Sequence, residues 1–446
     1  MKLVIYKEKL ISMLKKLSIY LIGLLPLALI AGPLIAEIFL FLLFIFFLYF
    51  LFKEKKFFLF DNRLFKVFLI FWFYLVTVSF FAPEKLVSLK SSFFYLRFGI
   101  YTISILYFLN SVKEHLNIIY LLYKFTLIFV IFDSFIQIFY GSDIFGLKPK
   151  SIDLMRISGP FGDKFVLGSF LQKILPVFIY FILKNYEKIK KIKWDDLLII
   201  ALSFVIIYRS GDRAALGLIL LFSLIFFIIY KPLRKKILLV SLIFLVMSAI
   251  ITFHNPKIFK RVFVDTIGQF KGQYYDKFLD KDISETKLNF MIFSFHHQSH
   301  FTTAFRMFLD KPIQGHGLKM FRYKCEKFAF RPEKKVNNSF GDSKEYYGCS
   351  THPHNTYFQL LSEAGIIGFL TIFVIFLYIF YRVVSLIIKN KNPLNPKYAL
   401  LIALFINLWP IIPTGNFFNN WLSMLYFIPI SYYLFENKYN SLEKIV

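Results

Sequence analysis

Three arginines of this sequence stand where a fixed positive charge could bind an anion. Arg97 lies inside an apolar run, Arg213 begins another run after a short polar turn, and Arg156 lies in a polar loop. A charge within a long apolar helix is costly, so it usually faces the interior of a helix bundle. A guanidinium group can bind two phosphate oxygens through parallel N–H bonds, which lysine cannot do. We expect these arginines to bind a lipid-linked phosphate or diphosphate.

Arg209, at the other end of the same polar turn, has a simpler interpretation. A long cationic side chain near a helix end can extend its charge to the water interface. We expect Arg209 to do so, and the same interpretation is the alternative for Arg97 and Arg213.

His354 is the candidate general base. It precedes a long apolar run, Pro353 favours extended backbone before it, and Asn355 or Thr356 can cap the helix that follows. At a helix N-terminus the positive end of the dipole disfavours protonation of an imidazole. A neutral base opposite an anion site suits group transfer, while a structural histidine that bonds the loop to the helix is the alternative.

Sequence motifs of soluble enzymes and of metal sites are missing. The chain has no G-x-x-x-x-G-K-[ST], no G-x-G-x-x-G and no H-E-x-x-H. The acidic pair in Asp280-Lys281-Asp282 and the neighbouring His296, His297 and His300 complete no recognisable set of metal ligands. We therefore expect no metal and no cofactor.

The composition indicates whether this is a soluble protein or a membrane protein. The chain has 446 residues, of which 57% are hydrophobic, 21% aromatic and 18% charged, whereas a soluble domain is about half apolar and about a quarter charged. The net charge of +27 comes from short Lys and Arg clusters between apolar runs, which is typical of membrane topology. An all-α polytopic membrane protein is predicted, without a nucleic-acid partner.

About twelve apolar runs approach the length of about 20 helical residues that crosses the hydrocarbon core. They lie at residues 17–32, 34–52, 65–82, 92–110, 117–140, 164–183, 196–209, 213–230, 237–253, 357–388, 398–413 and 420–436. Gly32-Pro33 is the only break between the first two runs, and a proline suits the first turn of a new helix.

Alternate loops carry the positive charge. Lysines and arginines cluster around residues 53–63, 184–193, 231–236 and 389–397, on the same side as the basic N-terminus. That side is predicted to be cytoplasmic, and so are both termini. The predicted organisation is nine spans in residues 1–253, one large loop on the opposite side at 254–356, and three spans with a cytoplasmic tail in 357–446.

The large loop contains the only two cysteines, Cys325 and Cys349. Because this loop faces an oxidising compartment in the predicted topology, a disulfide is favoured over two free thiols. A helix is predicted over residues 284–310 from its apolar periodicity, and Pro312 with Gly315-His316-Gly317 is predicted to end it in a turn.

Several of these segments together resemble one protein family. His354-Asn355 is followed by Glu363 and by Gly365-x-x-Gly368, a pattern similar to that of the O-antigen ligase and Wzy-type polymerase superfamily. Three further segments resemble family motifs, from about residue 90 onward: Ser210-Gly211-Asp212-Arg213, Arg156-Ile157-Ser158-Gly159-Pro160-Phe161 and the turn Pro312-Ile313-Gln314-Gly315-His316-Gly317.

The resemblance implies a GT-C-like, metal-independent, inverting glycosyltransferase at the periplasmic face of the bacterial inner membrane. It would take a glycan from undecaprenyl diphosphate, with His354 as base and Arg213 and Arg156 on the departing diphosphate. Family members commonly carry an arginine in the loop helix, where this chain has histidines, so His297 or His300 is expected at that position, or the two arginines act alone.

The resemblance leaves the acceptor open. It is lipid A core for a ligase and another undecaprenyl-linked glycan for a polymerase. A lipid-linked glycan transporter is the rival from another class, but it predicts inverted repeats and polar residues in both halves of the bundle. The sequence shows no such repeat.

Overall fold

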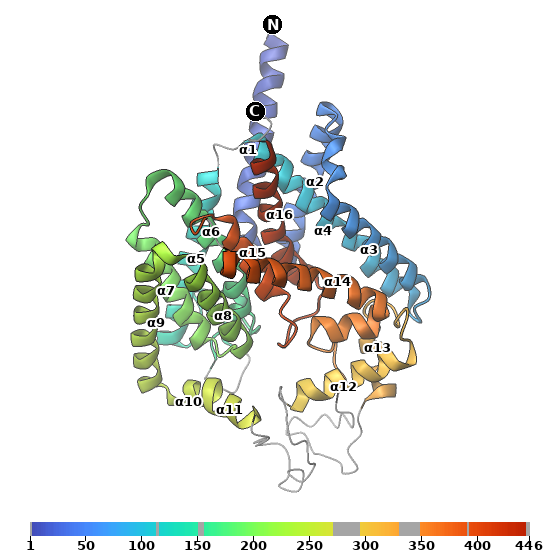
Figure 1. The fold of residues 1–446 in the computed structure, drawn as a ribbon, viewed down its shortest axis with the longest axis vertical. Coiled ribbons are helices and arrows are strands. Elements are labelled where there is room, and N and C mark those ends of the chain that lie inside the picture. Colours follow the sequence, from blue (N-terminus) through green and yellow to red (C-terminus); the bar gives the residue numbers. More distant parts are fainter. Residues whose placement is uncertain are drawn as a thin grey trace.

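The computed structural model describes residues 2–112, 116–149, 156–270, 295–329, 348–389 and 392–442, and helices are the only regular secondary structure in these ranges. Figure 1 shows their arrangement. The α-helices are α1 (Lys2–Ala31), α2 (Pro33–Glu54), α3 (Arg63–Phe80), α4 (Lys85–Ser111), α5 (Leu116–Tyr140), α6 (Leu167–Ile189), α7 (Trp194–Arg209), α8 (Arg213–Ile229), α9 (Arg234–His254), α10 (Pro256–Phe259), α11 (Asp265–Phe270), α12 (Phe295–Asp310), α13 (Phe321–Phe328), α14 (Thr356–Lys389), α15 (Lys397–Asn407) and α16 (Asn420–Leu442).

Every apolar run identified in the sequence overlaps a helix, although the helix in the run at 398–413 ends at Asn407. Within the described ranges, eight helices are long and apolar enough to cross a membrane: α1 to α6, α9 and α14. The runs at α7, α8 and α15 form helices of 16, 17 and 11 residues, which are shorter than the about 20 residues that span the hydrocarbon core. The fold is that of an all-helical polytopic membrane protein.

The break between the first two helices lies where the sequence predicts it. α1 ends at Ala31, Gly32 adopts a φ of 132°, and Pro33 begins α2. The predicted helix at 284–310 is present as α12 from Phe295 onward; its first part, like Asp280-Lys281-Asp282, lies outside the described residues.

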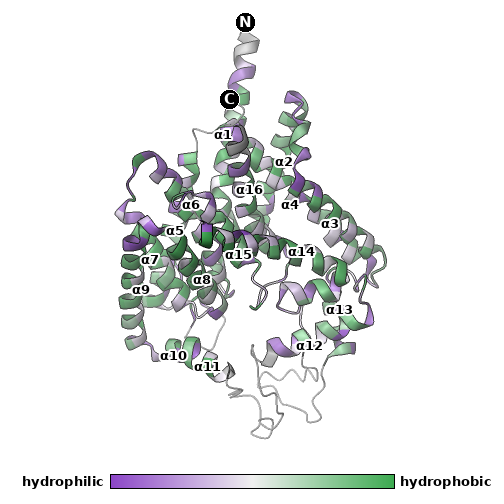
Figure 2. Cartoon of the chain, viewed as in Figure 1, coloured by the Kyte–Doolittle hydropathy of each residue, from purple (hydrophilic) through white to green (hydrophobic). Residues whose placement is uncertain are grey.

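The two ends of the helical assembly differ. Both chain termini lie at one end, and α10 to α13 lie at the other (Figure 1). In Figure 2, hydrophobic residues cover most of α9, whereas hydrophilic residues gather in connecting segments and on α12. This arrangement places the described part of the large insertion opposite the termini.

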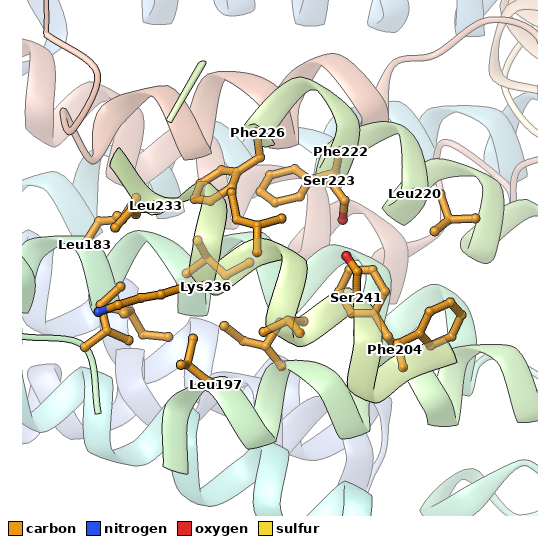
Figure 3. A pocket seen from close by; sticks show the side chains of 17 residues that line it. Leu183, Leu197, Phe204, Leu220, Phe222, Ser223, Phe226, Leu233, Lys236 and Ser241 are labelled. Carbon is orange, nitrogen blue, oxygen red and sulfur yellow. The ribbon is translucent and has the colours of Figure 1, made fainter. Parts of the chain in front are cut away.

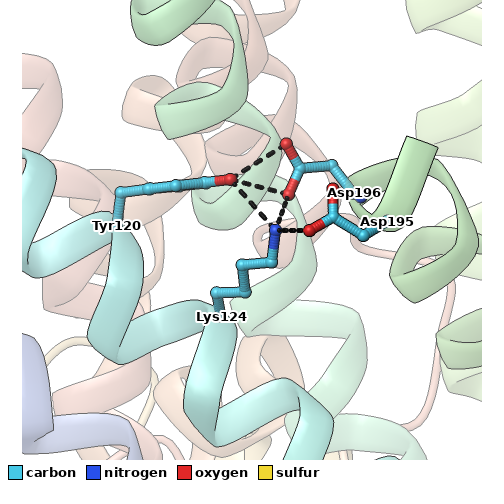
Figure 4. Close-up of polar contacts among 4 residues, drawn as sticks. All are labelled: Tyr120, Lys124, Asp195 and Asp196. Carbon is cyan, nitrogen blue, oxygen red and sulfur yellow. Dashed lines mark hydrogen bonds and ion pairs between the residues drawn. The ribbon is translucent and has the colours of Figure 1, made fainter. Parts of the chain in front are cut away.

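A polar cluster fixes the start of α7 against α5 (Figure 4). The Lys124 ammonium lies 2.5 Å from Asp195 Oδ2 and 2.8 Å from Asp196 Oδ1, and the Tyr120 hydroxyl donates to Asp196 Oδ1 at 2.7 Å. Asp196 is buried, so removing Lys124 would leave a buried carboxylate without its main counter-charge. The cluster thereby fixes the start of α7 and helps to orient this helix, whose other end is Arg209.

Candidate functional site

The principal polar cavity of the described structure has a volume of about 930 Å³. α6, the turn between α7 and α8, α12, α13, the segment before α14 and the start of α16 all contribute to its wall. The charged residues that line it are Arg156, Lys173, Arg213, Arg261, Arg322 and Asp212. Five cations and one carboxylate leave this wall with an excess of positive charge, which favours an anionic ligand.

The turn between α7 and α8 organises one side of the cavity. Gly211 adopts a φ of +65°, a conformation that favours glycine. Asp212 caps α8, because its side chain accepts a hydrogen bond from the Ala215 N–H at 3.1 Å. Arg213 then becomes the first residue of α8, and its Nη1 donates to Thr266 Oγ1 at 3.4 Å.

Two more arginines bind the same turn through its carbonyl groups. Arg156 Nε donates to the Ser210 carbonyl at 3.0 Å, and Arg261 Nε donates to the Gly211 carbonyl at 3.2 Å. Each bond uses the Nε atom, so each guanidinium also presents N–H donors at Nη1 and Nη2. Three arginines from three segments thus meet around one glycine.

Arg156 lies close to an aromatic ring and to another cation. Its guanidinium carbon lies 4.2 Å from the centre of the Phe165 ring. Burial lowers the pKa of Arg156 to about 10, and repulsion from Arg261 contributes to the shift. The group stays charged at neutral pH, and a bound phosphate would relieve the repulsion.

His354 lies at the mouth of α14, as the sequence predicts. Its φ is 56°, and its carbonyl accepts a hydrogen bond from the Thr414 N–H at 2.8 Å. Asn355 caps the helix by accepting bonds from the Tyr357 and Phe358 N–H groups at 2.9 and 3.2 Å. The Asn355 amide also donates to the carbonyl of Pro410 at 2.8 Å, so it fixes both the helix start and the opposite loop.

The imidazole of His354 has three histidine neighbours. Its ring centre is 4.0 Å from that of His352, 5.4 Å from that of His300 and 5.6 Å from that of His297. Burial lowers the pKa of His354 to about 4, with a further contribution from His300, and burial likewise lowers the pKa of His352 to about 3. Both rings are neutral at neutral pH, so His354 can accept a proton.

A break in α14 receives the turn after α12. Gly365 has a φ of 64° and a ψ of −167° within α14. The Ile366 N–H donates to the Pro312 carbonyl at 2.8 Å, and the His316 N–H donates to the Ser362 carbonyl at 3.0 Å. A Cβ atom on Gly365 would lie 2.1 Å from the Ile313 carbonyl oxygen. The two glycine motifs therefore form one joint between the insertion and α14.

Glu363 and Gly368 complete this joint. Glu363 is fully buried, its Oε1 accepts the Phe321 N–H at 3.1 Å, and its Oε2 accepts the Gln359 amide at 2.9 Å. The glutamate thereby holds the start of α13 against α14. A Cβ atom on Gly368 would lie 2.4 Å from Ala364 Cβ, so Ala364 of the preceding turn leaves no room for a side chain at this position.

A disulfide fixes the far end of α13. Cys325 and Cys349 are bonded, with their Cα atoms 5.2 Å apart. Cys325 lies one turn after Arg322, and Cys349 lies shortly before His352. The bridge therefore connects a cation of the cavity wall to the segment that carries the histidines.

The family comparison supplies the remaining observation. Residues 198–373 match the family model described as O-antigen ligase. This match supports membership of the O-antigen ligase superfamily. No curated protein matches the chain significantly.

The region matched to the O-antigen ligase family is narrower than the resemblance seen in the sequence. It extends from α7 into α14, and so contains Arg213, His354 and the joint at Gly365. Arg156 lies outside it and is added to the site by its hydrogen bond to the turn.

The structure brings together most of the residues that the sequence singled out. Arg156, Arg213, His297 and His354 line the cavity, and the His300 ring lies beside that of His354. Asn355, Glu363, Gly365 and Gly368 position the wall around them.

Two arginines lie elsewhere than expected. Arg97 forms an ion pair with Glu37 of α2, with Nη2 and Oε1 2.8 Å apart, and it does not line the cavity. We therefore leave it out of the anion site. Arg209 is buried and does not extend to the interface, because the end of α7 is enclosed by the protein.

Three cations of the cavity were missed in the sequence: Lys173, Arg261 and Arg322. A signal for Lys173 was available, since an ionisable residue inside a predicted span marks a functional position by default. Arg261 and Arg322 lie in polar segments rich in lysine and arginine, where nothing local separates them from their neighbours.

Proposed function

We propose that this chain is a glycosyltransferase that moves a glycan from undecaprenyl diphosphate to the hydroxyl of an acceptor sugar. One observation carries the proposal: a single cavity unites the neutral imidazole of His354 with Arg156, Arg213, Arg261 and Arg322. A base and an anion site in one cavity are what transfer from a diphosphate-activated donor requires.

In the proposed reaction the acceptor oxygen attacks the anomeric carbon of the donor. His354 accepts the hydroxyl proton, the new C–O bond forms, and the bond between the anomeric carbon and the phosphate oxygen breaks with inversion. The electron pair of that bond leaves with the diphosphate. The arginines around Gly211 stabilise its added negative charge. Two of them, Arg156 and Arg261, are already held in place by hydrogen bonds to the Ser210 and Gly211 carbonyl groups.

The chain's own cations take the charge-stabilising role in this mechanism. No group of three or more His, Cys, Asp or Glu side chains suited to a metal ion occurs among the described residues. The donor is already activated by its diphosphate, so we propose a reaction independent of metal and cofactor.

The proposed setting is the bacterial inner membrane, with the cavity at the periplasmic face, both termini cytoplasmic and a GT-C-like arrangement of helices. The acceptor we favour is lipid A core, as for an O-antigen ligase. The alternative is polymerase activity, with a second undecaprenyl-linked glycan as acceptor.

The first experiment measures transfer per folded molecule. Purified wild type, His354→Ala and His254→Ala are compared for glycan transfer from undecaprenyl diphosphate, after their thermal melting has been matched. His254 is exposed at the end of α9, so its variant should transfer normally, whereas His354→Ala should lose transfer. Turnover near that of wild type by His354→Ala would move the search for the base to His352, His297 or His300.

A second experiment separates ligase from polymerase. The gene is deleted in its native organism and lipopolysaccharide is analysed on gels. Core without O-chain, together with accumulated polymerised lipid-linked glycan, indicates a ligase. Core capped with one repeat unit indicates a polymerase.

A further inference from the structure

A second cavity lies between α6, α7, α8 and α9, and it shares no lining residue with the cavity that contains His354 (Figure 3). Its volume is about 100 Å³. Leu197, Phe204, Leu220, Phe226 and Phe244 are among its lining residues, and the polar members of the lining are Ser223, Ser241 and Lys236. A cavity of this composition favours a hydrocarbon chain over a polar ligand.

α9 places this cavity next to the membrane. The helix lies at the margin of the assembly (Figure 1). Leu238, Leu242 and Leu245 are exposed on it, while Val240 is buried and lines the cavity. One face of α9 is thus available to lipid, and the opposite face forms the cavity wall.

Lys236 gives the cavity a charged end. It lies in the first turn of α9 and is half-buried, and its ammonium is 5.8 Å from the centre of the Tyr186 ring. Further cations lie in the two neighbouring connections, between α6 and α7 and between α8 and α9, or at the helix ends beside them: Lys188, Lys190, Lys191, Lys193, Lys231, Arg234 and Lys235. Asp195 and Asp196, the nearby acids of α7, are bound to Lys124.

We propose that this cavity binds part of an acyl chain of a membrane phospholipid whose anionic headgroup contacts Lys236. The apolar lining would contact the acyl chain, and the positive charge of Lys236 at the membrane–water interface would favour an anionic headgroup. In Figure 1, α9 runs down to α10, so its start is the end of the helix that points away from α10 to α13 and towards the chain termini. A donor whose diphosphate lies in the His354 cavity could not also place that group at Lys236. The inference is therefore independent of the glycan-transfer proposal.

The test compares lipids that share acyl chains and differ in headgroup. Full-length protein is reconstituted in nanodiscs of phosphatidylcholine containing one part in five of phosphatidylglycerol, then released and examined by native mass spectrometry for retained lipid. Wild type should retain phosphatidylglycerol at least several-fold over its share in the nanodisc. Equal retention of the two lipids, or retention of a polyprenyl phosphate in their place, would overturn the proposal.

Three variants assign the preference to this cavity. Lys236→Gln should lose the headgroup preference, while Lys235→Gln, which removes an exposed charge outside the lining, should keep it. Equal loss in both variants would mean that the general positive field selects the lipid, and the proposal would be wrong. Ser241→Phe fills the cavity and should reduce retention of both lipids; if Lys236→Gln does not fold, this variant decides, and unchanged retention in it contradicts the proposal.

Discussion

At the scale of single residues, the site depends on the fork geometry of its arginines. Arg213 lies among Arg156 and Arg261, which are held by backbone carbonyls of the same turn. In that position a planar group with several N–H donors can bind two phosphate oxygens, whereas an ammonium is a point charge.

Replacing Arg213 by lysine should therefore slow transfer although the charge is kept. Loss of one stabilising donor to the leaving group costs roughly 100-fold in rate, and we expect a fall in kcat of that order for Arg213→Lys. The matched control is Arg382→Lys on α14, because Arg382 is half-buried and binds Tyr378 outside the cavity. A kcat for Arg213→Lys within twofold of the control would contradict the role given to this arginine.

The pH dependence of transfer should report the buried histidine. A free histidine titrates near 6.5, but burial and His300 lower the pKa of His354 to about 4. A base that acts in its neutral form keeps its activity as the pH falls past 6.5 and loses it only as the pH falls through about 4. We expect kcat/KM to stay level from pH 7 to about pH 5; an acid limb near 6.5 would contradict the buried environment.

The same histidines couple pH to stability. Because the pKa values of His352 and His354 are lower in the folded protein, the unfolded chain binds more protons once the pH falls below about 6.5. The free energy of unfolding should therefore decrease as the pH falls from about 6.5 towards 4. The kinetic profile has to be normalised to the folded fraction at each pH.

At the scale of elements, the joint between the insertion and α14 is the most constrained feature. Gly365 has a positive φ, and a Cβ atom added to it would lie 2.1 Å from the Ile313 carbonyl oxygen. Two separate costs thus act on any side chain there: the left-handed backbone and the displacement of Ile313.

Gly365→Ala should destabilise the protein by at least ~1–3 kcal/mol, the usual cost of such a conformation. Gly217→Ala is the control, because Gly217 lies within α8 and a Cβ would meet no atom within 4 Å. Thermal melting in detergent should fall for Gly365→Ala and stay level or rise for Gly217→Ala. Similar melting of the two variants would show that the docked turn is not a strong constraint.

The disulfide is the second constraint on the same element. Its two cysteines are 24 residues apart in sequence, and closing a loop of this length stabilises a fold by ~3 kcal/mol on the chain-entropy model. The double variant Cys325→Ala/Cys349→Ala should melt earlier and transfer more slowly, because α13 with Arg322 loses its tie to the His352 segment. Alkylation of both thiols in native membranes without reductant would show that the bond does not form there.

At the scale of the whole molecule, one prediction concerns topology. Charge clusters predict that the connections around Lys190 and Lys235 are cytoplasmic, and the described structure places the termini opposite α10 to α13 (Figure 1). Reporter fusions at Lys190 and Lys235 should read cytoplasmic, and a fusion at Lys311 should read periplasmic. A periplasmic signal at Lys190 would overturn the arrangement and, with it, the proposed face of the site.

The sequence alone predicted the helices and several of the residues that line the cavity. Apolar runs, the Gly32-Pro33 break, the Asn355 cap and the two glycine motifs are local signals, since hydropathy and backbone preference act within a few residues. The cysteine pair and His354 at the start of α14 could be read in the same way.

Only the tertiary structure decided which cations share the site. Arg97 and Arg213 look alike in sequence, yet Arg97 meets Glu37 of α2 while Arg213 meets Arg261 and Arg156. Likewise, Gly365 could be read as a close helix contact, but it is the break onto which residues 312–317 dock. The physical reason is common to both cases: the partner of a side chain or a strained backbone depends on how helices distant in sequence pack, and that packing is set by the whole bundle.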